Sequence, residues 1–520
     1  MSQSQTTPVP AYKGLPLVII TASVMLGTLI QTLDSTIANV ALPYMQGSMS
    51  ASQDEINWVL TSYIITSAIM TAPTSFLASR FGRTRIFIVS IAGFTVASVL
   101  CGMSQSLTQI VMFRLIQGAF GGALVPLSQT VLLEIFSLEK RAAAMALWGI
   151  GVQVGPIIGP IIGGWLTQNL SWRWVFYVNI PFGILATLGL LFFLKETKVN
   201  TTMRMDWLGF GALSLGIGAL QLVLDRGEIV DWFSAREIVI EACLAAIGFY
   251  LFAVQTVLAP KPFLSPKLFT DGNFLIGTAM IFLIGLNLYA TLALFAPYLQ
   301  NLSGDPVITA GFLLAPRGGG TIIAMLIAGR LVGHIDVRFF VGTGFIAGAL
   351  ALYQFAQWTP DVSHTKIIVW GMVQGFSVGF IFMPLTTVIY ATLPTSLRTE
   401  AAGVFSLLRN MGSAIGISIT GALLTTNTQV NHAILGATIT PFNHMLQSGA
   451  LGRFWNPAHA AGAALLNSTI TRQAQIISYA NDFWLMFILT LVVMPLVLLI
   501  RPGRAGITAA AQPAAPQQAG

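Results

Sequence analysis

The sequence has 520 residues, of which 55% are hydrophobic and only 8% are charged. Soluble globular domains carry about 25% charged residues, so the composition excludes a protein that is dissolved in water along its whole length. The formal net charge of +7 comes from basic residues scattered in short segments between apolar runs. Because they form no single patch or arm, no nucleic-acid partner is expected.

Long apolar runs recur along the whole chain. A bilayer core of about 30 Å needs about 20 apolar residues per helix. Only helices and closed barrels satisfy their backbone in lipid, and these runs lack the alternation of barrel strands. The sequence therefore predicts an all-α polytopic membrane protein. Five of these runs contain no Asp, Glu, Lys or Arg at all: 56–79, 86–113, 142–172, 339–360 and 367–397.

Apolar runs and the turn residues between them predict fourteen transmembrane helices. In chain order we expect them at 15–41, 56–79, 85–104, 107–134, 142–167, 174–194, 206–224, 237–258, 272–299, 308–332, 338–358, 366–392, 398–425 and 482–500.

The basic residues predict how the chain is oriented in the membrane. Sixteen fall on the side of the N-terminus and six on the other side, while Arg114, Arg317 and Arg409 lie within helices. The positive-inside rule then places the N-terminus in the cytoplasm, and an even number of helices returns the C-terminus there. Residues 504–520, rich in Ala, Pro and Gln, are expected to form a disordered cytoplasmic tail.

An internal repeat predicts the domain organisation. Residues 78–82, 117–126 and 140–144 resemble 328–333, 374–384 and 397–401 in the same order. Parallel repeats of this kind are typical of transporters with a central cavity. The prediction is two six-helix bundles plus two inserted helices, with domains at 1–200, 201–262 and 263–503.

Residues 426–481, between the last two predicted helices, are expected to form a long loop on the outer side. Three of the five histidines lie there, at spacings that fit no common metal site. They are interpreted as solvated or capping residues, and no cofactor is expected.

Asp34 interrupts the first predicted span. An ionisable group at the centre of a bilayer costs roughly 2.5–3.5 kcal/mol on insertion scales, so it needs a reason to be there. One interpretation is a proton carrier, because burial favours the neutral carboxyl. The other is a carboxylate locked to a partner only to hold helices together.

Arg114, in the fourth predicted helix, is the natural counter-charge of Asp34. Because arginine keeps its charge inside proteins, it can hold Asp34 ionised until a proton or substrate changes the balance. A purely structural anchor is the alternative. Polar candidates for lining an otherwise apolar substrate cavity, besides this pair, are Gln31, Asn39, Gln117 and Gln129.

The fifth predicted helix carries Gly151, Gly155, Gly159 and Gly163 at intervals of four, with Pro156 and Pro160 between them. Small residues at this spacing allow close contact between helices, and proline bends a helix. We therefore expect a kinked interface helix on which the two six-helix bundles rock. Motifs typical of ATP hydrolysis or hydrolytic catalysis, such as GxxxxGK[ST], HExxH and GxSxG, are absent, so an enzyme is not expected.

Several motifs now point to one family. They are LDSTIANVALP at 33–43, RLIQG at 114–118, GPIIGPIIGG at 155–164 and WRWVFYVNIPFG at 172–183. The chain resembles the major facilitator superfamily, in its fourteen-helix drug:proton antiporter branch and its Emr-type subgroup. The resemblance spans roughly 15–502. It implies proton transfer through Arg114 and an antiporter motif comprising Gly155, Gly159, Pro160, Gly163 and Gly164.

One motif departs from the family pattern. The loop between the second and third helices reads LASRFGRTR, with Ser79 where the superfamily usually has an acid. The resemblance implies that Arg80, Gly82 and Arg83 belong to a cytoplasmic gating loop. Either these arginines find another acidic partner, or the gate is looser.

The resemblance also implies a function and partners. It predicts proton-coupled antiport of lipophilic drugs, uncouplers or amphipathic acids across the inner membrane of a Gram-negative cell. A periplasmic adaptor and an outer-membrane channel would complete a three-part exporter. The alternative is a dedicated exporter of one metabolite, such as a fatty acid or a siderophore; a passive channel is a further rival.

Overall fold

The structure is a computed structural model that describes residues 12–500, except 138–139, 197–198, 200–203, 333, 395–396, 438 and 440–458. The predicted tail at 504–520 lies outside the described residues. The described chain is helical, without strands. It contains thirteen helices long and apolar enough to cross a membrane, or fourteen if one bent pair counts as a span. This confirms the prediction of an all-α polytopic membrane protein.

The first group of helices contains Asp34, Arg114 and the glycine motif. Its members are α1 (Leu15–Met49), α2 (Gln53–Thr71), α3 (Thr74–Phe81), α4 (Arg83–Met103), α5 (Leu107–Gly121), α6 (Leu124–Ile135), α7 (Arg141–Asn169), α8 (Trp174–Tyr177) and α9 (Asn179–Phe193). The second predicted helix is split, because α2 and α3 meet at an angle of 55°. Pro73 at this break cannot donate a backbone hydrogen bond, which permits the bend.

The middle and last groups follow. The middle group is α10 (Trp207–Arg226), the short helix η2 (Trp232–Ser234) and α11 (Arg236–Leu258). The last is α12 (Lys267–Thr270), α13 (Gly272–Pro297), η3 (Tyr298–Leu302), α14 (Val307–Leu331), α15 (Val337–Phe355), α16 (His364–Ala391), α17 (Arg398–Ala437), α20 (Ala460–Val493) and η5 (Met494–Leu499).

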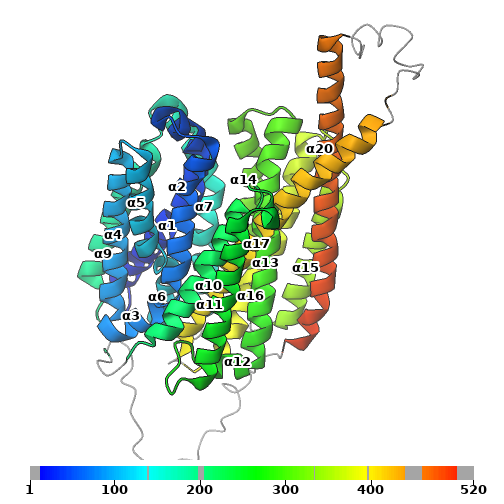
Figure 1. Ribbon diagram of the computed structural model, residues 1–520. Coiled ribbons are helices and arrows are strands. Elements are labelled where there is room, and N and C mark those ends of the chain that lie inside the picture. Colours follow the sequence, from blue (N-terminus) through cyan, green and yellow to red (C-terminus); the bar gives the residue numbers. More distant parts are fainter. Residues whose placement is uncertain are drawn as a thin grey trace, which may run out of the picture.

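The predicted loop at 426–481 is wrong over most of its length. Helix α17 continues to Ala437, and α20 begins at Ala460. A 40-residue helix is about 60 Å long, twice the thickness of a bilayer core, so much of α17 must project from the membrane. Figure 1 shows both helices extending beyond their neighbours. A helix in water needs no apolar run, which is why hydropathy missed these segments.

Helices α1–α9 pack mainly on one another, and so do α13–α20. We call these groups the first half and the second half; they occupy opposite sides of Figure 1. The main contact between the halves is made by α7 against α14, with further contacts of α6 on α17 and α7 on α16. Helix α10 packs on α11 and touches α2 and α17, so the inserted pair contacts both halves.

Candidate functional site: a buried ion pair and the cavity between the halves

Asp34 lies near the middle of α1 and is completely buried, as is Arg114 of α5. Arg114 Nη1 donates to Asp34 Oδ2 at 2.5 Å. The predicted pairing of these two residues is therefore present in the structure. Two amides complete the carboxylate shell: Gln117 Nε2 and Asn179 Nδ2 donate to Asp34 Oδ1 at 2.9 Å and 3.1 Å.

The guanidinium is held as firmly as the carboxylate. Arg114 Nε donates to the backbone oxygen of Val59 at 2.9 Å, and Nη1 also donates to Gln117 Oε1 at 2.9 Å. The ring of Tyr63 lies beneath it, 4.2 Å from Cζ. Helices α1, α2, α5 and α9 thus meet at one charged cluster, formed by Asp34, Arg114, Gln117 and Asn179.

This geometry has a clear chemical consequence. All three donors stabilise the negative carboxylate, and the arginine neutralises its charge. Protonation of Asp34 would leave Arg114 as a buried cation without an ionic partner, a state that costs several kcal/mol unless neighbouring groups rearrange. The charge on Asp34 is therefore linked to the packing of α1, α2, α5 and α9, which form the cluster.

Asn179 was not among the predicted site residues. It belongs to the motif at 172–183, which sequence analysis used only for the family resemblance. In the structure its Nδ2 also contacts Ser98 Oγ at 3.1 Å, and Ser98 donates to the backbone oxygen of Phe176 at 2.8 Å. These bonds connect α4, α8 and α9 to the cluster.

A second buried carboxyl, Asp482, was also missed. It is 1% exposed, and neither carboxyl oxygen has a hydrogen-bond partner within the described part of the chain. The predicted helix began at this residue, so the carboxyl was expected at a helix end. Because α20 begins at Ala460, Asp482 instead lies well inside the helix.

The glycines of the antiporter motif allow α7 to touch α1 beside Asp34. A Cβ at Gly155 would lie 2.4 Å from Thr32 Oγ1 and 2.6 Å from the backbone nitrogen of Leu33. At Gly159 it would lie 2.3 Å from Thr36 Oγ1, and at Gly163 2.8 Å from a side-chain carbon of Ile37. The stripe therefore packs inside the first half. Gly164 is buried, and Pro156 and Pro160 lie within one continuous helix; the kink stays a prediction.

Another face of α7 meets the second half. Side chains of Ile157 and Ile161 lie against Gly318 and Gly311 of α14. Helix α7 thus lies at the interface between the halves through these isoleucines and not through the glycine stripe, and it contacts α1 and α14 at once. Helix α7 therefore connects the helix that carries Asp34 with the contact between the halves.

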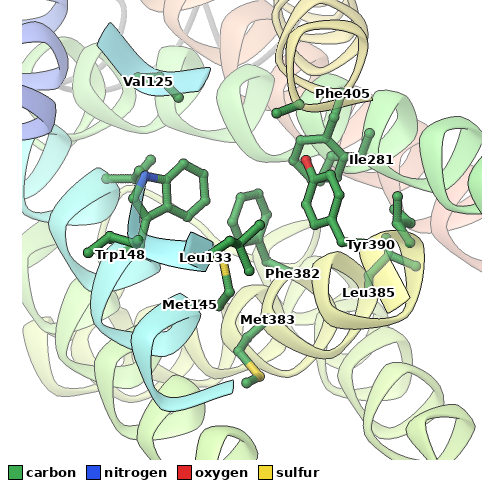
Figure 2. Close-up of a cluster of buried hydrophobic side chains, with 14 of the residues drawn as sticks. Val125, Leu133, Met145, Trp148, Ile281, Phe382, Met383, Leu385, Tyr390 and Phe405 are labelled. Atoms are coloured by element: carbon green, nitrogen blue, oxygen red, sulfur yellow. The ribbon is translucent and has the colours of Figure 1, made fainter. Parts of the chain in front are cut away.

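Aromatic side chains fill the interface between the halves (Figure 2). Trp148 of α7 stacks on Phe382 of α16 at 5.9 Å, and its Nε1 donates to Ser128 Oγ of α6 at 2.8 Å. Tyr390 of α16 donates to Gln129 Oε1 of α6 at 3.1 Å. Gln129 therefore lies at the interface, as part of a contact that joins the two halves.

A small cavity lies beside this aromatic cluster. Its wall combines α7 of the first half with α13, α16 and α17 of the second, and includes Gln153, Tyr289, Phe382 and Arg409. A larger cavity, of about 50 Å³, is lined by the second half alone. Because a transported molecule must pass between the halves, the first cavity is the better candidate for a substrate site.

The four predicted cavity residues do not line this cavity. Gln117 belongs to the charged cluster and Gln129 to the contact with Tyr390. Gln31 is half-buried and Asn39 is exposed. Their assignment to the substrate path stays a prediction.

Arg83 of the predicted gating loop, and Arg85 two residues further on, have acidic partners elsewhere in the chain. Arg83 forms two hydrogen bonds to Glu134 of α6, and Arg85 lies 3.6 Å from Glu196. Glu196 also accepts the backbone N–H groups of Thr84 and Arg85, which begin α4. The missing acid at Ser79 is thus compensated for Arg83, whereas Nη1 of Arg80 is buried without a hydrogen bond to the described residues.

Gly82 is required at this turn. Its φ of +99° is a conformation that L side chains rarely adopt, and a Cβ would lie 2.6 Å from the Glu196 carboxyl. At the same end of the bundle, burial together with Arg141 lowers the pKa of Arg398, which Glu134 partly offsets. Charged residues of both halves thus lie together at this end of the bundle. We call this group the basic end; its members are Arg83, Arg85, Glu134, Arg141, Glu196 and Arg398.

Comparison with known proteins decides the family. The model of the Major Facilitator Superfamily matches residues 24–417. The chain belongs to the major facilitator superfamily. The match spans both halves and includes the charged cluster, the glycine motif and the basic end. As a member of this superfamily, the chain is a multi-pass membrane protein of the transporter class.

Curated relatives extend over nearly the whole chain. The multidrug export protein EmrB of Escherichia coli (strain K12) is 36% identical over 495 residues, which cover 94% of this chain and 96% of EmrB. The fatty acid resistance protein FarB of Neisseria gonorrhoeae is 34% identical over 497 residues, covering 95% and 98%. Both similarities include the inserted helices, consistent with the Emr-type subgroup.

A solved structure supports the fold alone. The crystal structure of the human organic anion transporter MFSD10 (TETRAN) aligns with a TM-score of 0.57 at 14% identity, over 92% of this chain and 100% of that chain. At this identity the similarity concerns only the arrangement of the helices.

Proposed function

We propose that this superfamily member is a proton-coupled antiporter that exports lipophilic drugs, uncouplers or amphipathic acids across the inner membrane. The observation that carries the proposal is the buried cluster in which Arg114, Gln117 and Asn179 all donate to Asp34. The similarity to a named multidrug export protein supports the substrate class. Residues 12–14 and the basic end would face the cytoplasm.

The proposed coupling runs through α1 and α7. A proton on Asp34 removes the ion pair and frees Arg114, so the residues around it must repack. Thr32, Leu33 and Thr36 of α1 touch the glycines of α7, and α7 touches α14. Repacking at Asp34 would therefore bias the contact between the halves and change the side to which the cavity opens.

Proton movement in vesicles tests this proposal. In proteoliposomes with a preset pH gradient, adding a transported lipophile should release protons from the acidic side in proportion to protein content. The measurement is the fluorescence of a pH-sensitive dye, with empty liposomes as control. Substrate flux without any proton movement would favour a passive channel, and tight binding of a single metabolite without drug response would favour the dedicated exporter.

We further propose that the protein works with a periplasmic adaptor and an outer-membrane channel. The support is the projecting part of α17 and α20, held together by Asn431 with Ser478 at 3.2 Å and His432 with Asn467 at 2.9 Å. Val430 and Ile434, one helical turn apart on α17, are 51% and 60% exposed. Exposed apolar residues on a projecting helix are suited to binding another protein.

Replacing both Val430 and Ile434 with Ser tests this partnership. Drug resistance of whole cells should fall several-fold, because the adaptor would dock less well, whereas transport in proteoliposomes should be unchanged. Susceptibility is measured in cells lacking other pumps. Equal loss in both assays would mean that these residues support the fold, and full resistance in cells would place the docking surface elsewhere.

A further inference from the structure

Two buried arginines of the second half lie outside the charged cluster. Arg317 of α14 is 6% exposed and Arg409 of α17 is 7% exposed. No acidic side chain of the described residues forms an ion pair with either one. Arg114 differs from both, because Asp34 neutralises its charge.

Their hydrogen bonds leave donors unused. Arg409 Nη2 reaches only its neighbour Asn410, at 3.4 Å, and Nε has no partner within the described chain. Arg317 Nη2 donates to the backbone oxygen of Leu288 at 3.2 Å, while Nη1 is unsatisfied. A buried cation with spare donors is costly, and a bound anion that accepts from these donors would offset that cost.

The location of these arginines decides what they could bind. Arg409 lines the small cavity between the halves, which must widen to admit a ligand larger than water. Leu288, to which Arg317 is bonded, and the adjacent Tyr289 form another part of the same wall. Most of the remaining lining is apolar, including Val152, Ile284 and Phe382. The cavity thus combines positive charge with an apolar surface.

We propose that this cavity is an anion site for amphipathic acids, in which Arg409 binds the carboxylate, Arg317 adds positive potential from behind the wall, and the apolar tail lies against Phe382. This deepens the proposed function, on which it rests, by naming the substrate class and the residues that select it. Lipophilic cations are disfavoured, because two uncompensated positive charges oppose them. Neutral lipophiles gain only the apolar contact.

A matched pair of ligands tests the proposal. Purified protein in lipid nanodiscs is dialysed against decanoate or decan-1-ol at pH 8, and binding to empty nanodiscs is subtracted. The wild-type protein should prefer decanoate. The variant Arg409→Gln should weaken decanoate binding about tenfold or more, since a charge-assisted hydrogen bond contributes about 1.5–3 kcal/mol, and should leave decan-1-ol within about twofold.

Two control variants accompany this test. Arg409→Lys should retain most decanoate binding, because it keeps the charge. Arg330→Gln, which removes an exposed arginine from the end of α14, should change nothing. The proposal is overturned if Arg409→Gln binds decanoate like wild type, or loses both ligands equally. If that variant does not fold, equal affinity of the wild type for the two ligands overturns it.

The same ligands separate this inference from the proposed function. Preferential decanoate binding without any proton movement in vesicles would retain the anion site and remove the antiporter. Proton movement driven by drugs, but with no preference for decanoate over decan-1-ol, would retain the antiporter and remove the anion site.

Discussion

Replacing Asp34 with Asn should abolish uphill transport while leaving a folded protein in the membrane. Asn has nearly the same shape but cannot carry a transferable proton, so substrate efflux would no longer be coupled to the proton gradient. Arg114 keeps its bonds to Val59 and Gln117 and its contact with the Tyr63 ring, which preserves much of the local structure. The measurement is substrate-driven proton movement in proteoliposomes, expected to fall to the level of empty liposomes.

A matched control is Asp225→Asn in α10, which removes a partly buried carboxylate outside the cluster. Asp225 accepts from Gln221 at 2.8 Å, so the two substitutions remove chemically similar groups. Asp225→Asn should transport nearly normally. Normal drug-driven proton movement by Asp34→Asn would show that Asp34 is not the proton carrier and would leave it as a structural anchor.

The second large effect is expected at Gly155. Substitution by Ala would place a methyl group 2.4–2.6 Å from Thr32 and from the backbone of Leu33. A backbone atom cannot rotate away from a new methyl group as a side chain can. Helix α1 must therefore move away from α7 beside Asp34. Overpacking of this kind costs about 1–3 kcal/mol, and transport should fall more than expression does.

The control for Gly155→Ala is Gly342→Ala in α15, where the added Cβ would have no atom within 4 Å. That variant should match wild type both in thermal stability in detergent and in transport. Gly159→Ala should be milder than Gly155→Ala, because its nearest atom belongs to the side chain of Thr36. Unchanged efflux by Gly155→Ala would mean that the contact between α1 and α7 is not part of the transport cycle.

Sequence alone determined the class of protein and the core of the charged cluster. A bilayer core admits few charged groups, so composition and apolar runs predicted the membrane helices, and the scarcity of charge made Asp34 and Arg114 conspicuous partners. The family motifs then indicated the fold, which the superfamily match confirmed. These properties depend on local composition and on short motifs, which are read directly from the chain.

Tertiary structure decided everything that depends on contacts between distant segments. Asn179 became a ligand of Asp34 only through the packing of α9 on α1, and the glycine stripe of α7 found its partner in α1 rather than in the other half. The arginines of the second half looked like isolated charges until packing placed Arg409 in the cavity wall and Arg317 behind it. Hydropathy measures the tendency of a segment to enter lipid. It could therefore predict neither these contacts between distant side chains nor the helices that continue into water.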